Sequence, residues 1–112
     1  MIRQTIDQIK QKLHTAEELA DDLREQLLEK LEELDTELDS GEAAEYDSES
    51  LNSLVSFTQL SAHEALRPQQ DPELLKLALK GVERNLEQFE ADHPRLVNLV
   101  NNFCITLSNM GI

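Results

Sequence analysis

The sequence predicts an all-α protein, a small bundle of four to five helices built from antiparallel helical hairpins with coiled-coil-like packing. Strong helix formers dominate the 112 residues, whereas glycine and proline occur only three times each. Apolar residues recur every three or four positions in several segments, which is typical of helices that bury one face. The β-branched runs that a sheet would need are missing from the sequence. A chain of this length predicts one domain, residues 1–112.

The first 40 residues carry an apolar face with helical spacing. Its members are Ile2, Ile6, Ile9, Leu13, Ala16, Ala20, Leu23 and Leu27. By this pattern alone, residues 2–39 form one helix about 57 Å long. Thr15 with Glu18 matches a capping box, however, and Asp22 offers a second N-cap. We therefore favour a break near Leu19 to Asp22 and an acidic helical hairpin over residues 1–40, with the single long helix as the alternative.

The middle of the chain, residues 41–71, is predicted to hold a loop and one short helix. Gly41 suits the left-handed residue that closes the preceding helix. Residues 40–49 are polar and acidic and favour a loop, after which Ser48 or Ser50 caps a helix that ends before Pro68. The apolar side of this helix consists of Leu51, Leu54, Val55, Thr58 and Ala62.

Residues 72–112 are predicted to form a pair of helices, and the first has a strong start signal. Asp71 caps it, Pro72 takes the first helical position and Glu73 faces the positive end of the helix dipole. Gly81 costs about 1 kcal/mol of helix propensity relative to alanine, which favours a close approach of another helix there. The buried face consists of Leu75, Ala78, Leu79, Val82, Leu86 and Phe89. An exposed basic row consists of Lys76, Lys80 and Arg84.

The last helix begins at Pro94, after Asp92 and His93, and ends at Gly111. Arg95 is its only charged residue. Because the remainder is apolar apart from four asparagines, a serine and a threonine, we expect this helix at the centre of the bundle. Its apolar residues are Leu96, Val97, Val100, Phe103, Cys104 and Leu107.

The charge of the chain is concentrated in one stretch and restricts the possible partners. Residues 17–49 hold 15 acidic and two basic residues, a net charge of −13, which equals the formal charge of the whole chain. The chain lacks the basic stripe that nucleic acid or an anionic membrane surface would require. The acidic stretch instead suits a protein partner with a basic face. The candidate partner surface consists of Glu25, Glu29, Glu32 and Glu33.

No residue pattern predicts catalysis, a cofactor or a metal site. His14, His63 and His93 lie far apart in sequence, without the ligand spacing of zinc sites. Cys104 lies on an apolar helix face, as an inert buried thiol does. The stretch 35–41 resembles the start of a calcium loop but has its glycine one position late. We therefore expect a protein that is not an enzyme.

The location of the protein follows from the same composition. One cysteine cannot form an internal disulfide, so nothing indicates an oxidising compartment. The first residues lack the apolar core of a signal peptide. No apolar run approaches the roughly 20 residues that span a bilayer. We expect a cytoplasmic protein.

Two stretches near the C-terminus, Phe89 to Leu96 and Leu107 to Ile112, resemble a bacterial family known as domain of unknown function 4404. Leu13-His14 and Leu23 to Leu28 are similar to the opening of that family. Residues 43–72 look like an added segment, since the family members are shorter. The resemblance implies a small bacterial helical protein and carries over no catalytic residues.

For function, the sequence favours a non-enzymatic protein–protein interaction or structural module. The heptad-like spacing indicates a homodimer joined through the N-terminal helices. One alternative is an acidic decoy that inhibits a basic or nucleic-acid-binding protein. A cryptic metal-binding or catalytic function is the third possibility.

Overall fold

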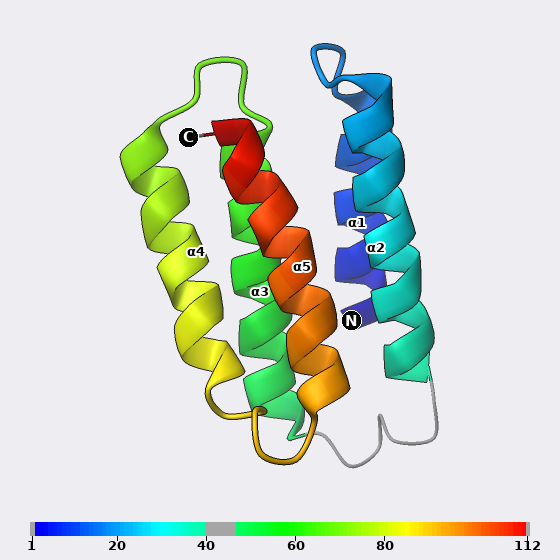
Figure 1. The fold of residues 1–112 in the computed structure, drawn as a ribbon, viewed down its shortest axis with the longest axis vertical. Helices are drawn as coiled ribbons and strands as arrows, with labels where there is room; N and C mark the ends of the chain where they lie inside the picture. The colour runs from blue at the N-terminus through cyan, green and yellow to red at the C-terminus, as the bar shows by residue number, and fades with distance from the viewer. Residues whose placement is uncertain (1, 40–46, 112) are drawn as a thin grey trace.

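The computed structural model describes residues 2–39 and 47–111, and this part of the chain contains five helices and no strand (Figure 1). The all-α class predicted from the sequence is confirmed. The helices are α1 (Ile2–Thr15), α2 (Asp21–Asp39), α3 (Ser48–Ala65), α4 (Pro72–Leu86) and α5 (Pro94–Gly111). The predicted closure of the second helix at Gly41 lies outside the described residues.

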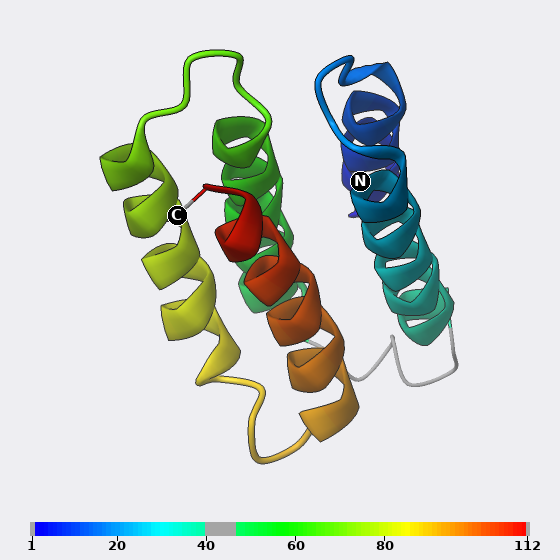
Figure 2. The ribbon, with the colours of Figure 1, turned by 45° about the horizontal axis from the view of Figure 1, so that its top comes forward.

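All five helices contribute buried side chains to the core, and α4 covers the side of α3 and α5 away from α2. Consecutive helices run in opposite directions (Figure 1). Helix α3 packs against α1, α4 and α5, and α5 packs against α2, α3 and α4. In the described residues α4 contacts only α3 and α5, on the side away from the α1–α2 hairpin (Figures 1 and 2). The sequence placed only the last helix at the centre, whereas α3 and α5 share that position.

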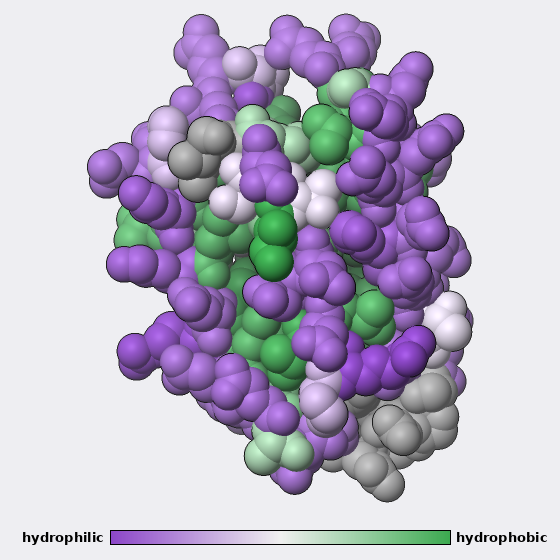
Figure 3. Space-filling view, in the orientation of Figure 1, coloured by the Kyte–Doolittle hydropathy of each residue, from purple (hydrophilic) through white to green (hydrophobic). Residues whose placement is uncertain are grey.

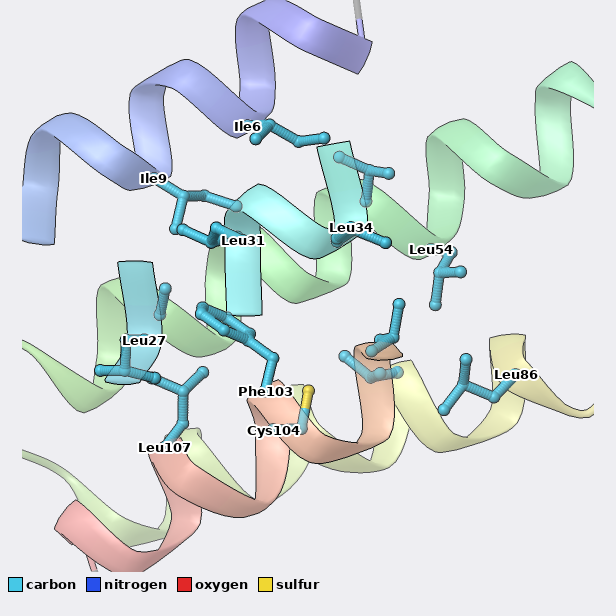
Figure 4. Packing of buried hydrophobic residues seen from close by; sticks show 14 of the residues in the cluster. Ile6, Ile9, Leu27, Leu31, Leu34, Leu54, Leu86, Phe103, Cys104 and Leu107 are labelled. Atoms are coloured by element: carbon cyan, nitrogen blue, oxygen red, sulfur yellow. The ribbon is translucent and has the colours of Figure 1, made fainter. Parts of the chain in front are cut away.

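The core forms where the apolar faces of these helices meet. In Figure 4 the ring of Phe103 points from α5 toward Leu31 of α2, and Ile6 and Ile9 approach the same helix from α1. Each fully buried leucine or isoleucine contributes about 1.5–3 kcal/mol relative to an exposed one. The largest fully buried side chains are Phe103, Ile6, Ile9, Leu13, Leu27, Leu31, Leu54, Leu75, Leu96, Leu107, Val82 and Val100.

A turn at residues 16–20 separates α1 from α2, so the N-terminal segment is a hairpin and not one long helix. Arg24 holds this turn. Its guanidinium donates to the carbonyls of Leu13 (2.9 Å), Ala16 (2.5 Å) and Leu19 (3.2 Å). It also pairs with the Asp21 carboxylate at 2.9 Å. One partly buried side chain thus satisfies carbonyls that the end of a helix leaves without partners.

The residues predicted to cap the second helix have other roles. Thr15 is the last residue of α1, and its hydroxyl donates to the Gln11 carbonyl at 3.0 Å. It cannot cap a following helix, because the chain turns directly after it. Helix α2 begins at Asp21, and the Asp22 carboxylate accepts from the Leu23 amide at 3.0 Å. Both acidic residues lie in the first turn, where the helix dipole stabilises negative charge.

Helix α3 ends before Pro68, as predicted, but it begins slightly earlier than expected. Its N-cap is Asp47 and not Ser48 or Ser50. The Asp47 carboxylate accepts from the hydroxyl (2.6 Å) and the amide (3.2 Å) of Ser50, and these hydrogen bonds lower the pKa of Asp47. The helix continues to Ala65, for 18 residues in total. Its apolar pattern is weak because polar residues, including Ser61 and Thr58, are buried along with the apolar ones.

The start of α4 is as predicted, but its end is earlier. The Asp71 carboxylate accepts from the amides of Glu73 (3.0 Å) and Leu74 (3.4 Å), with Pro72 in the first helical position. Phe89 is buried but lies beyond the helix, which ends at Leu86. The Phe89 amide donates to the Leu86 carbonyl, three residues back, as in the tighter turns that often end helices.

Gly81 allows α3 and α4 to approach closely. A β-carbon at this position would lie 2.3 Å from Cδ1 and 2.9 Å from Cγ of Phe57. The glycine predicted to permit close packing therefore does so against the Phe57 ring of α3.

We predict that Gly81→Ala destabilises the protein by about 1–2 kcal/mol, because overpacking against Phe57 outweighs the gain in helix propensity. In a Phe57→Ala background the same substitution should stabilise α4, since the ring is absent. Urea unfolding of the four proteins of this cycle measures both effects. Stabilisation by Gly81→Ala in the wild-type background would contradict the close approach.

Candidate functional site

The four glutamates predicted as a partner surface are all exposed on α2. Glu25, Glu29 and Glu33 follow one another at helical spacing on the side opposite the buried leucines, and none pairs with another described residue. We call these three the acidic ridge. Glu32 points toward α1, where its carboxylate accepts from Lys10 Nζ at 2.7 Å. The structure thus brings together three of the four predicted residues.

The two flanks of α2 are neutralised within the chain. Toward α1, Lys10 lies 2.7 Å from Glu32 and 3.5 Å from Asp35, and Arg3 pairs with Asp35 and Asp39. The hydrogen bond from Lys10 to Glu32 is the main cause that raises the pKa of Lys10. These pairs are worth little energetically because most of the side chains involved are exposed.

Toward α5, Arg95 Nε lies 2.7 Å from the Glu37 carboxylate. Arg95 is the only charged residue of α5. It therefore neutralises the second flank of α2, and the unpaired negative charge of this helix faces outward along the acidic ridge.

The basic row of α4 does not contact the acidic helix. Lys76, Lys80 and Arg84 are exposed, and no described residue forms an ion pair with them. Because α4 and α2 lie on opposite sides of the bundle, the basic row cannot dock the acidic helix within one chain (Figure 1).

The structure offers no metal cluster or activated nucleophile in its described ranges. No three histidine, cysteine or acidic side chains gather there in a way that could hold an ion. His14 and His63 are exposed, and His93 lies half-buried with its ring 6.2 Å from that of Phe89. Cys104 is buried in the core, and burial raises the pKa of its thiol to about 12. The thiolate that a nucleophile requires is therefore strongly disfavoured.

An exposed apolar surface, which the sequence analysis missed, follows the seam between α3 and α4. Leu60, Leu74 and Leu77 have exposed fractions of 43%, 42% and 63%. Phe57 of α3 lies opposite Gly81 of α4 in this antiparallel pair. One turn toward the C-terminus of α3 and the N-terminus of α4, Leu60 lies level with Leu77, and Leu74 comes one turn later in the same direction. We call Phe57, Leu60, Leu74 and Leu77 the α3–α4 strip. The sequence does contain one signal of this surface, because helical spacing places Leu77 away from the buried face of α4.

A second feature that the sequence does not reveal is a cavity of about 730 Å³ at one end of the bundle. It lies between the α1–α2 turn and the C-terminal end of α3, and we call it the end cleft. Figure 3 shows the surface hollowed there, with apolar side chains at its floor. Its lining comes from segments far apart in sequence, including Lys12, Leu19, His63 and Met110.

Comparison with known proteins identifies a family and nothing more specific. The family model described as "Domain of unknown function (DUF4404)" matches residues 27–112. The matched range includes residues 43–72, the segment that resembles an addition to the family. It excludes Leu13-His14 and most of the stretch Leu23 to Leu28. No curated protein and no solved structure matches the chain. In the described residues, no helix combines the length and the apolar character needed to cross a membrane.

We predict that Cys104 reacts with a water-soluble disulfide reagent at pH 8 about 1000-fold more slowly in the native protein than after unfolding. A thiol pKa near 12, against an ordinary value of 9.0, leaves about that much less thiolate. The release of the coloured thiol measures both rates. A native rate within tenfold of the unfolded rate would show that Cys104 is accessible and activated.

Proposed function

The chain belongs to the DUF4404 family, whose description names no activity, and we propose that it is a non-enzymatic protein–protein interaction module. The observation that carries this proposal is the α3–α4 strip. Of the four large apolar residues that are exposed in the described residues, three lie on this seam. Several large apolar side chains exposed along one seam of a small domain are typical of a protein-binding site.

The acidic ridge supports the proposal in a different way. Its carboxylates have no partner among the described residues, so no described cation neutralises their negative charge. Such a field attracts a partner with a basic surface and raises the association rate at low salt. We assign to the strip the larger part of the binding energy and to the ridge the steering of the partner.

The unpaired ridge also favours a second candidate function, the acidic decoy. In that case the ridge occupies a basic site on the partner, and binding weakens steeply with ionic strength. A cryptic metal-binding function has no supporting observation among the described residues, and we do not propose it.

The homodimer stays a prediction, but the interface predicted for it needs revision. The heptad-like residues of the N-terminal helices, among them Ile6, Leu13, Leu31 and Leu38, are buried inside a single chain. Among the side chains of α1 and α2 that the structure describes, they leave no apolar seam for a second copy. If two copies associate, the α3–α4 strip is the surface that supplies the apolar area. The cytoplasmic location and the bacterial origin also stay predictions.

We predict that Leu60→Ser with Leu77→Ser abolishes specific partner capture from lysate of the source cell, and any self-association, without lowering the melting temperature. Both side chains are exposed in the single chain, so their loss should cost the fold little. Ile105→Ser is the matched control, because Ile105 is 51% exposed on α5 and outside the strip. Mass spectrometry of captured proteins and light scattering provide the readouts.

A second variant separates the two candidate functions. Glu25→Gln, Glu29→Gln and Glu33→Gln together remove the ridge but keep the Lys10–Glu32 pair. The interaction module should keep its partner in this variant, with slower association at low salt. Partners that are lost with the ridge and retained without the two leucines would establish the decoy instead.

A further inference from the structure

The end cleft has the dimensions of a small-molecule site. Its volume of about 730 Å³ falls within the usual range of ligand pockets, about 300–1,000 Å³. One wall is the α1–α2 turn, and the other is the end of α3 with the residues that follow it. Spaces between the helices of a bundle are a common position for such sites.

The walls of the cleft are largely apolar. Leu19, Leu66 and Met110 are partly buried against the core, so each leaves apolar surface available to the cavity. Leu23 and Ala16 are half-buried beside them. A ligand that covered these side chains would gain roughly 25 cal/mol per Å² of apolar surface removed from water.

Two basic side chains converge on the same cleft. Lys12 Nζ lies 2.5 Å from His63 Nδ1, across α1 and α3. Because an ammonium group can only donate, the imidazole Nδ1 accepts in this contact. One turn away, Gln59 donates to Gln8 at 2.7 Å and keeps the two parallel helices in the same register.

The basic pair has no carboxylate partner in the described residues, which distinguishes it from the third basic residue of the cleft. Arg67, also in the lining, pairs with the buried Glu64 at 2.9 Å. The ammonium group of Lys12 instead donates to the imidazole ring of His63. An anionic group placed there would replace the uncharged acceptor with a charged one, so that both partners of the hydrogen bond are ionised.

We propose that the end cleft binds a small amphipathic anion, a single-chain carboxylate, whose carboxylate lies on Lys12 and His63 and whose alkyl chain covers Leu19, Leu23 and Met110. Glu17 and Glu18, which also line the cleft and are exposed, limit the negative charge that the site accepts. The site therefore prefers a monoanion to a multiply charged headgroup. This binding is separate from the interaction at the α3–α4 strip.

The test is a titration of the full chain with decanoate below its aggregation concentration, followed by calorimetry and by amide chemical shifts. We expect saturable binding of one decanoate, with shifts at the cleft residues. Lys12→Met keeps the apolar stem and should weaken binding at least ~10-fold, as loss of a charge-assisted hydrogen bond does. Lys30→Met, a half-exposed lysine on α2 with no described ion pair, should bind like the wild type.

Further ligands and a second variant complete the test. Decanol lacks the anion and acetate lacks the chain, and both should bind at least ~10-fold more weakly, while decyl phosphate should be weakened by its second charge. His63→Gln provides a second lesion if Lys12→Met does not fold. The proposal is overturned if decanoate does not saturate, if Lys12→Met and His63→Gln bind it as the wild type does, or if the shifts map to the α3–α4 strip.

Discussion

The structure depends on one reversal of the chain, at residues 16–20. Acidic residues cover the other faces of α2, so this helix is soluble only if an apolar surface covers its buried leucines. The hairpin supplies that surface, because it turns Ile6 and Ile9 of α1 toward Leu31 and Leu34 of α2 (Figure 4). Arg24 stabilises the reversal, because its guanidinium donates hydrogen bonds to three carbonyls at the turn.

The position of the charges follows from this reversal. With the leucines of α2 buried, one flank of this helix meets the cations of α1 and the other meets Arg95. The ridge of Glu25, Glu29 and Glu33 has no partner among the described residues. The apolar α3–α4 strip lies across the bundle from this ridge. In the described residues, neither α3 nor α4 contacts α2. The turn also forms a wall of the end cleft, so the proposed carboxylate site exists only in the folded-back chain.

Features set by local chemistry could be predicted from the sequence, and features set by tertiary register could not. Asp71 and Pro94 mark helix starts through interactions within one turn, and both helices begin as expected. Asp47 was missed as a cap, because Ser48 and Ser50 offered equivalent local signals. The α3–α4 strip and the end cleft need the relative placement of helices that sequence periodicity does not contain. Gly81 is an intermediate case. Its cost in helix propensity predicted the close approach of another helix, but the sequence could not identify Phe57 as the residue that lies against it.

The most direct test of this account is the distance between the two ends of the N-terminal segment. Spin labels at Gln4→Cys and Thr36→Cys, both exposed positions, can be measured by double electron–electron resonance in a Cys104→Ser background. Two helices packed side by side, with axes about 8–10 Å apart, place the labels roughly 20–30 Å from each other. A continuous helix would separate the same positions by about 48 Å. The shorter distance is the result that the hairpin predicts, and the longer one would contradict it.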